Sequence, residues 1–130
     1  MSRTNYSTGA PWEAIVGYSR AVRIGPFVEV SGTVAADANG PVAVGDPGAQ
    51  TTFILKKIEN SLEEAGATLS DVIRTRIFVT DISQWEAVGR AHGEVFGEIR
   101  PCTAMVEVSK LIAPEYMVEI EVSAIIAAAV

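Results

Sequence analysis

Two segments near the C-terminus decide the fold: residues 101–108, with the sequence PCTAMVEV, and residues 118–122, with the sequence VEIEV. Both alternate with a period of two and are rich in β-branched residues, so each predicts a strand. One face of the first carries Cys102, Ala104, Val106 and Val108, and the other carries Thr103, Met105 and Glu107. One face of the second carries Val118, Ile120 and Val122, and the other carries Glu119 and Glu121. We expect two neighbouring strands that turn their carboxylates to the same side, which a simple solvated sheet does not require.

The composition is that of a globular protein and argues against several classes of function. A chain of 130 residues fits one domain spanning residues 1–130. The formal net charge of −6 and the pI near 4.7 make nucleic acid an unfavourable partner, because neutralising phosphates requires positive charge. The single cysteine cannot form an internal disulfide, the N-terminus lacks a signal-like apolar stretch, and no apolar run reaches membrane-spanning length. We therefore expect a cytoplasmic protein with no membrane contact.

The remaining strands are marked by alternation and by turn residues. Residues 18–24 and 27–31 flank Gly-Pro and predict a hairpin. Residues 72–80 predict a further strand, with Ile73, Ile77 and Val79 on one face and Arg74, Arg76 and Phe78 on the other. Residues 37–48, rich in glycine and proline, predict an excursion or a short hairpin, and residues 1–13 predict irregular structure.

Two helices are predicted between these strands. The first begins with Asp46 as N-cap and Pro47 at the first position, and it ends at Gly66. Its apolar ladder consists of Phe53, Ile54, Ile58, Leu62 and Ala65. The second follows a cap at Asp81 or Ser83. Its apolar stripe consists of Trp85, Val88, Val95 and Phe96.

The order of these elements predicts an α+β fold, a mixed β-sheet with two helices on one face. Crossover connections keep one hand, so both helices should cover the same face. The opposite face is predicted to carry Arg74, Arg76, Phe78, Thr103, Met105, Glu107, Glu119 and Glu121. This face is either solvated, with charges paired across strands, or packed against other subunits. Cross-strand pairs contribute only about 0.2–1 kcal/mol each, and Phe78 and Met105 among the charges favour a subunit interface.

Separated motifs in the chain resemble those of the Rid (YjgF-like) family, in the same order and spacing. They are Tyr18-Ser19-Arg20-Ala21-Val22, Val30-Ser31-Gly32-Thr33, Leu62-x-x-Ala65-Gly66, Asp71-Val72, Arg100-Pro101 and Val118-Glu119-Ile120-Glu121. The resemblance covers nearly the whole chain. It implies a chorismate-mutase-like fold that assembles as a homotrimer with ligand clefts between subunits. It also implies a small-molecule metabolite as the ligand: the best-known members are enamine/imine deaminases that hydrolyse 2-aminoacrylate-type intermediates without a cofactor or a metal.

One position departs from the family pattern. Where the family deaminases carry Pro-Ala-Arg-Ser, whose arginine clamps the substrate carboxylate, this chain carries Pro101-Cys102-Thr103-Ala104. Thr103 can donate one neutral hydrogen bond but cannot form a bidentate charged pair. A charged hydrogen bond contributes about 1.5–3 kcal/mol, so losing it puts the usual substrate in doubt.

Other positions match the family's cleft residues, and the resemblance gives each a role. Tyr18 would stack on the ligand or hydrogen-bond to it, and Ser31 would also bind the substrate. Glu119 matches the glutamate that holds the hydrolytic water, so we expect it to be the catalytic general base or acid. On charge pattern alone, Glu119 would instead pair with Arg74 or Arg76 and do no chemistry.

Two further residues invite a chemical role. His92 is the only histidine, and it could bind substrate or move a proton near neutral pH, or serve only in packing. Cys102 has no Cys-His-Asn signature around it and lies on the apolar face of its strand, so we expect a buried structural thiol. One His and one Cys without ligand spacing offer no metal site.

Three functional hypotheses follow. The first is a Rid-like hydrolase of a small imine or enamine, with Glu119 as catalytic residue and Tyr18, Ser31, Thr103 and His92 as substrate-binding residues. The second is a small-molecule binding protein that keeps the cleft without the chemistry. The third is a ribonuclease or translation inhibitor, as some relatives have been described, which the acidic charge disfavours.

Overall fold

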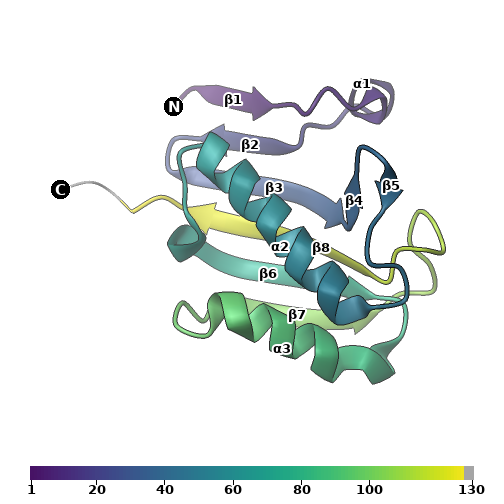
Figure 1. Cartoon of the computed structure of the whole chain (residues 1–130). Coiled ribbons are helices and arrows are strands. Elements are labelled where there is room, and N and C mark those ends of the chain that lie inside the picture. The colour runs from purple at the N-terminus through teal and green to yellow at the C-terminus, as the bar shows by residue number, and fades with distance from the viewer. Residues whose placement is uncertain (128–130) are drawn as a thin grey trace.

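The protein, described by a computed structural model over residues 1–127, has one layer of helices on one face of a six-stranded mixed sheet (Figure 1). The strands of this sheet are β1 (Arg3–Tyr6), β2 (Ala21–Ile24), β3 (Phe27–Val34), β6 (Val72–Val79), β7 (Cys102–Glu107) and β8 (Val118–Ile125). They lie in the order β1-β2-β3-β8-β6-β7, and only the β6–β7 pair is parallel. β4 (Ala36–Asp37) and β5 (Gly40–Pro41) form the short hairpin predicted for residues 37–48.

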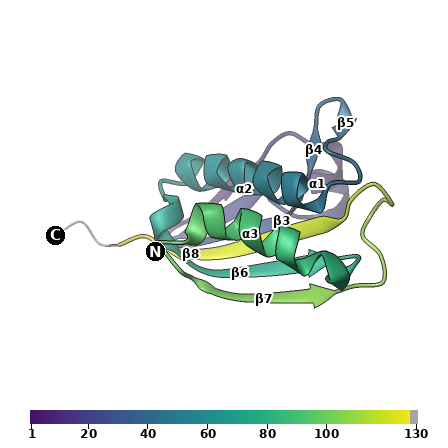
Figure 2. The ribbon, with the colours of Figure 1, turned by 60° about the horizontal axis from the view of Figure 1, so that its bottom comes forward.

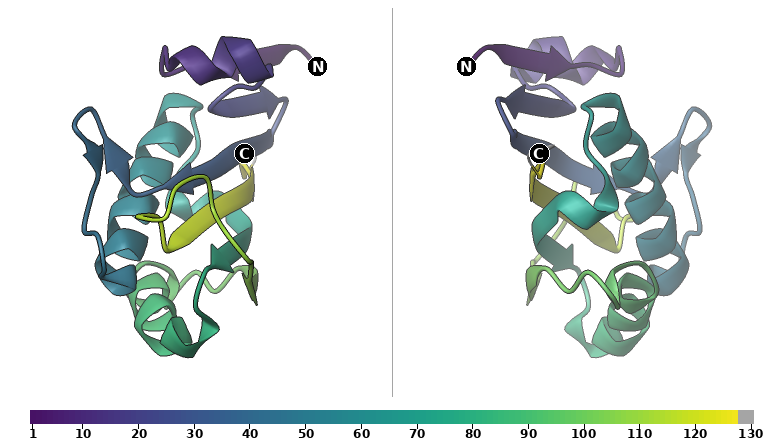
Figure 3. Two further views of the ribbon diagram at one scale, coloured as in Figure 1. Left: turned by 90° about the vertical axis from the view of Figure 1, so that its right-hand side faces the viewer. Right: turned by 90° about the vertical axis from the view of Figure 1, so that its left-hand side faces the viewer.

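The two long helices are the crossovers of this sheet. α2 (Pro47–Glu64) connects β3 through the small hairpin to β6, and α3 (Trp85–Phe96) connects β6 to β7. Both lie on the same face, as the handedness of crossovers predicts (Figure 2). A short helix, α1 (Pro11–Val16), lies near the edge strand β1, and α3 lies toward the opposite edge of the sheet (Figure 3).

The core lies between α2 and the central strands. The α2 ladder buries Ile54, Leu55, Ile58 and Leu62. Against it pack residues of the central strands: Val28, Val30, Ile77, Val79, Val118, Ile120 and Val122. Each such side chain contributes about 1.5–3 kcal/mol when fully buried, so the central strands hold the fold and position the residues that alternate with them.

The first turn of α2 is capped as its sequence predicts. The Asp46 side chain accepts a hydrogen bond from the backbone N–H of Ala49 at 3.0 Å, and Pro47 occupies the first helical position. At the other end Gly66 has φ = 87°, a left-handed conformation that ends the helix at little cost for glycine.

Replacing Asp46 by Ala should lower the free energy of unfolding by about 1 kcal/mol, because the first turn loses the acceptor of one of its free N–H groups. Chemical denaturation followed by circular dichroism would measure this change. Asp46→Asn, which keeps an acceptor oxygen, should lose much less. An equal loss in the two variants would contradict the capping role.

The order of the last strands corrects one prediction. β7 and β8 are not neighbours, because β6 lies between them, parallel to β7 and antiparallel to β8. The crossover through α3 brings β7 beside β6 at the edge of the sheet, while the longer return places β8 in the centre.

The faces of β7 are also opposite to the prediction. In register, Arg74 lies beside Cys102 and Thr75 lies beside Thr103, so Thr103 shares the helix-covered face with Thr75. Met105 and Glu107 share that face because they lie beside Ile77 and Val79. Cys102, Ala104 and Val106 face away from the helices, and Cys102 is exposed rather than a buried structural thiol. Alternation divided the residues of β7 into the correct two groups, but the prediction assigned each group to the wrong face of the sheet. An edge strand beneath α3 does not need an apolar residue at every position that faces the helices.

Three smaller predictions were wrong. Ile73 is exposed because the β6–β8 register shifts between Val72 and Arg74, and Trp85 is exposed at the start of α3. Residues 1–13 are not wholly irregular, since they contain β1 and the start of α1. β1 is a polar edge strand, and polar edge strands give no hydrophobic alternation to detect.

The face opposite the helices, here called the open face, combines charged and apolar side chains on four strands. Its members are Phe27, Glu29, Arg74, Arg76, Phe78, Cys102, Ala104, Val106, Glu119, Glu121 and Ser123. Phe27 is 51% exposed and Val106 is 47% exposed, although neither is charged. No element among residues 1–127 covers this face.

Candidate active site

Glu119 lies in a pocket where β3, β8 and the start of β2 meet. The pocket has a volume of about 420 Å³ and is lined by Tyr18, Arg20, Ser31, Gly32, Val34, Lys57, Ile112 and Glu119. Three of the five residues predicted from the sequence, Tyr18, Ser31 and Glu119, therefore line one pocket. Tyr18 is 39% exposed, so its ring is accessible to a ligand.

An irregularity in β3 gives the Glu119 carboxylate its place. The β3–β8 register shifts between Val30 and Thr33, so Ser31 and Gly32 are not paired in the ladder. Ser31 Oγ donates a hydrogen bond to the carbonyl of Ser19 at 2.6 Å, which ties the bulge in β3 to the residues that precede β2. A Cβ atom built on Gly32 would overlap Oε2 of Glu119. The carboxylate thus lies directly against the glycine backbone, an approach that a side chain at position 32 would prevent.

The substitution Gly32→Ala should therefore lower the activity that depends on Glu119 at least about tenfold, because displacement of a reacting group by about 1 Å can cost a factor of ~10². Steady-state kinetics of the purified variant would measure the loss. The matched control is Gly93→Ala on α3, where a new Cβ meets nothing within 4 Å. The control should keep its activity and gain up to about 1 kcal/mol of stability. A Gly32→Ala protein with unchanged activity would contradict the close approach.

The surroundings of Glu119 disfavour its ionised form. Partial burial raises the pKa of the Glu119 carboxyl, the nearby Arg20 guanidinium lowers it, and Glu121 raises it further, with a net upward shift. The ion pair with Arg74 or Arg76 considered from the sequence does not form. Arg76 pairs instead with Glu121, with 3.6 Å between Nη1 and Oε1. Glu119 is thus a half-buried carboxylate free of a salt bridge among the described residues, an arrangement typical of a general acid or base.

The other two predicted residues, Thr103 and His92, belong to a second group on the helix-covered face. Thr75 Oγ1 donates to Thr103 Oγ1 at 2.7 Å and lies 2.9 Å from His92 Nε2. With Thr75 donating in this direction, His92 must donate from Nε2 to the Thr75 oxygen. The hydroxyl hydrogen of the exposed Thr103 is then free for a ligand.

His92 is held as a neutral ring. Burial lowers the pKa of the His92 imidazole, and its ring packs against Phe96 with 4.8 Å between centroids. A neutral imidazole can donate from one nitrogen and accept at the other, which suits a relay of hydrogen bonds.

Within one chain the two groups are separate. Glu119 lies on the open face beside Phe78, whereas Thr103 lies on the helix-covered face beside Thr75. Thr103 and His92 do not line the Glu119 pocket. One chain alone therefore holds two separate groups of predicted site residues, and neither group encloses a ligand by itself.

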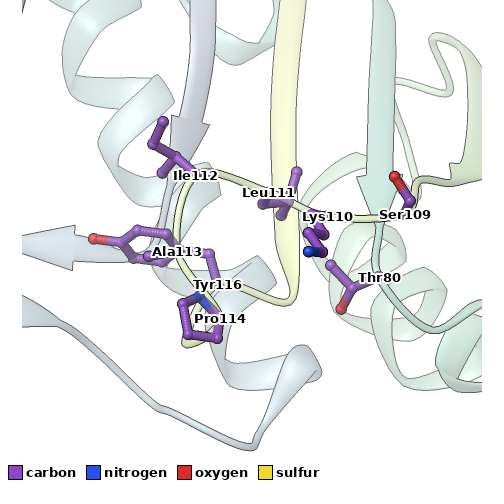
Figure 4. A pocket seen from close by; sticks show the side chains of 8 residues that line it. All are labelled: Thr80, Ser109, Lys110, Leu111, Ile112, Ala113, Pro114 and Tyr116. Carbon is purple, nitrogen blue, oxygen red and sulfur yellow. The ribbon is translucent and has the colours of Figure 1, made fainter.

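A second cavity borders the Glu119 pocket. It has a volume of about 480 Å³ along the connection between β7 and β8 (Figure 4). Its lining consists of Thr80, Ser109, Lys110, Leu111, Ile112, Ala113, Pro114 and Tyr116. Ile112 lines both cavities and is 87% exposed, so this connection forms one rim of the Glu119 pocket. The larger cavity holds no carboxylate or histidine, which leaves acid–base chemistry to the Glu119 pocket.

Sequence reasoning missed three residues of these groups. Thr75 was overlooked because a threonine in a buried strand carries no chemical signature by itself. Gly32 lies against Glu119 only because the register of β3 shifts, and Lys57 reaches the pocket only because α2 packs over that end of the sheet. Neither contact can be read from the sequence. Arg20, which belongs to the Tyr18–Val22 motif, also lines the pocket.

Over residues 1–127, no cluster of three or more His, Cys, Asp or Glu side chains is placed to hold a metal ion. None of the helices in that range combines the length and apolarity needed to span a membrane.

Comparisons with known proteins agree with this architecture. Residues 8–126 match the model of a protein family described as endoribonuclease L-PSP. A Mycobacterium tuberculosis protein, described as a member of the YjgF/YER057c/UK114 family, has a crystal structure with a TM-score of 0.88. It is 54% identical, and the match covers 96% of this chain and 100% of that one. The 3-aminoacrylate deaminase RutC of Acinetobacter baylyi is 36% identical over 104 residues, which cover 79% of this chain and 82% of the relative.

Proposed function

Because the chain belongs to the endoribonuclease L-PSP family, the YjgF/Rid proteins, we propose that it hydrolyses a small imine or enamine to a carbonyl compound and ammonia. Glu119 is the general base of this proposal. The observation that carries it is the half-buried Glu119 carboxylate, which lies against Gly32 in an open pocket and forms no salt bridge among residues 1–127. The resemblance of the chain to a protein named 3-aminoacrylate deaminase supports the same reaction class.

The proposed chemistry needs only a positioned water and a proton carrier. Glu119 accepts a proton from water while the water oxygen forms a bond to the imine carbon and the C=N electron pair moves to nitrogen. The protonated carboxyl then returns its proton to the nitrogen. Glu119 then takes the hydroxyl proton of the carbinolamine and passes it to the amino nitrogen, while the C=O bond forms and the C–N bond breaks, which releases ammonia. An enamine enters the same sequence after protonation at carbon. A carboxyl with a raised pKa is suited to both halves, because its carboxylate is a stronger base than that of an ordinary glutamate and its protonated form is more accessible near neutral pH.

We further propose that the site is completed by a second copy of the chain, in the homotrimer expected from the resemblance. Two features support this assembly. The open face exposes Phe27 and Val106 without cover, and the two groups of site residues lie on opposite faces of one sheet. In the cleft, the group of Tyr18, Ser31 and Glu119 from one subunit would face the Thr103–Thr75–His92 relay of its neighbour.

The test is ammonia release from freshly generated 2-aminoacrylate and from bulkier imines, measured against the uncatalysed rate. Release at the uncatalysed rate for every substrate would reject hydrolysis by this protein.

The pH dependence of kcat/KM should show the raised pKa of Glu119. A general base works only when ionised, so activity should fall on the acid side, with a midpoint above the ordinary glutamate value of about 4.3. Stopped-flow assays between pH 4 and pH 8 would locate the midpoint. An acid limb at or below that ordinary value would contradict the desolvated environment of this carboxylate.

A second candidate function is suggested by Thr103. Its hydroxyl cannot replace the charged clamp of the family deaminases, so the protein would bind a metabolite in the same cleft without turning it over. Thermal shifts caused by metabolites, with no ammonia release above background, would favour this candidate. Turnover would eliminate it.

Ribonuclease activity, which the family's description names, is disfavoured by the net charge of −6. RNA cleavage that persists through extensive repurification and vanishes in a site variant would be needed to support it.

A further inference from the structure

Two cationic side chains, Arg20 and Lys57, lie between the Glu119 pocket and a smaller cavity behind it. Both line the Glu119 pocket. Both also line a neighbouring cavity of about 200 Å³, together with Thr8, Thr33, Asn60, Ser61 and Glu64. With Glu119 ionised, the Glu119 pocket therefore carries two positive charges against one negative charge.

The Arg20 guanidinium has more hydrogen-bond donors than acceptors. It carries five N–H groups, yet among residues 1–127 it donates only from Nη2 to the carbonyl of Gly32, at 2.7 Å. Its Nε is buried without a partner. A buried donor without an acceptor costs free energy until one arrives, and a carboxylate is the acceptor that matches the planar fork of a guanidinium.

Lys57 brings a second charge to the same place. Its Nζ donates to the carbonyl of Ala36 at 2.8 Å, and neither Lys57 nor Arg20 forms an ion pair in the described part of the chain. Burial, and then the charge of Arg20, lower the pKa of the Lys57 amine. Two cations that repel one another at a pocket wall favour an anion between them.

We propose that Arg20 and Lys57 are the anion-binding pair of this site and determine its specificity for a substrate with an acidic group. This inference rests on the proposed hydrolase function and deepens it. The pair stands on the same wall as Glu119, whereas the position from which the family arginine would act carries Thr103 on the other face of the sheet. The acidic group of the substrate is thus held by the subunit that supplies the general base.

The pair also orients the substrate. The guanidinium is tied to the carbonyl of Gly32, the residue against which the Glu119 carboxylate lies. A carboxylate bound by Arg20 therefore lies at a fixed distance from the general base, and its adjacent imine carbon lies where a water held by Glu119 can attack.

Two substrates of the same size separate charge recognition from structure. They are 2-iminopropanoate, which carries a carboxylate, and 2-iminopropanamide, which does not. Arg20→Met should lower kcat/KM about ten- to a hundredfold more for the carboxylate than for the amide, and most of this difference should appear in KM. Lys57→Met should act in the same direction but less, and Arg20→Lys should recover part of the loss.

The matched control is Arg23→Met on β2, close to Arg20 in the sequence. The Arg23 guanidinium is satisfied by the carbonyls of Gly25 at 2.9 Å and Ala65 at 2.8 Å, away from the Glu119 pocket. It should lower Tm without altering KM for either substrate. An Arg20→Met protein that loses both substrates equally, or neither, would overturn the proposal.

A binding measurement keeps this inference separable from hydrolysis. Calorimetric titration with pyruvate, the product of the charged substrate, should show binding by wild type that is lost in Arg20→Met. If wild type releases no ammonia yet binds pyruvate through Arg20, the hydrolase function fails and the anion site stands. If pyruvate does not bind to wild type, the anion site fails whatever the outcome of hydrolysis.

Discussion

Replacing Glu119 by Gln is expected to lower kcat/KM for imine hydrolysis by about 10²–10⁴-fold, because the amide has the shape of the carboxyl but cannot accept the proton of the attacking water. KM should change much less than kcat, since glutamine can still hydrogen-bond to a bound ligand. Ammonia release coupled to a spectrophotometric assay would measure both constants.

The matched control for this variant is Glu121→Gln. Glu121 lies two residues along β8 on the same face and pairs with Arg76, outside the Glu119 pocket. It should keep activity within a few-fold of wild type, provided that sedimentation shows both variants to be assembled like wild type. Equal losses in the two variants, or an active Glu119→Gln protein, would contradict the assigned role.

Stability should move in the opposite direction from activity in Glu119→Gln. Folding raises the pKa of the Glu119 carboxyl, so ionisation costs stability as the pH rises from the unfolded-state pKa through the folded-state value. Wild type and variant should therefore have equal stabilities near pH 4, and the variant should become the more stable one toward pH 7. A variant that is less stable at pH 7 would show that Glu119 is a structural residue.

Replacing Val106 by Asp should dissociate the assembly and abolish activity while leaving the chain folded. Val106 lies on the open face beside Phe78 and is about half exposed in a single chain, so the substitution removes little from its own core. In an assembly, the same change buries an unpaired charge at a cost of about 3–5 kcal/mol per site, which weakens association at least ~100-fold.

The matched control is Val44→Asp. Val44 is 60% exposed and lies in the connection between β5 and α2, away from the open face. It should change neither the sedimentation coefficient nor the activity. Circular dichroism would establish that both variants are folded. A Val106→Asp protein that stays assembled and active would show that the open face is solvated.

The parts of the fold that could be predicted are those marked by hydrophobic alternation or by helix-capping residues. The Asp46 cap, the α2 ladder and the apolar face of β8 follow from spacing, and the structure confirms them. The neighbours of β7 were not predictable in the same way. The chain order places it next to β8, whereas the crossover through α3 pairs it with β6, and pairing decides which face of an edge strand meets the helices.

The candidate site shows the same division. Tyr18, Ser31 and Glu119 were assigned from motifs that lie far apart in the chain, and the structure brings them into one pocket. Thr103 was placed on the face of Glu119 and lies on the opposite one. The closeness of Glu119 to Gly32 depends on a register shift in β3, and the unsatisfied Arg20 guanidinium depends on the packing around it. Neither has a signature in sequence spacing.

Further copies of the chain are expected to cover the open face and to complete the site around Glu119. Sedimentation equilibrium of the wild-type protein at the concentration used for the activity assay tests this assembly most directly. A single species of three times the chain mass of 13.8 kDa is expected. A single species of 13.8 kDa that retains activity would contradict the assembly.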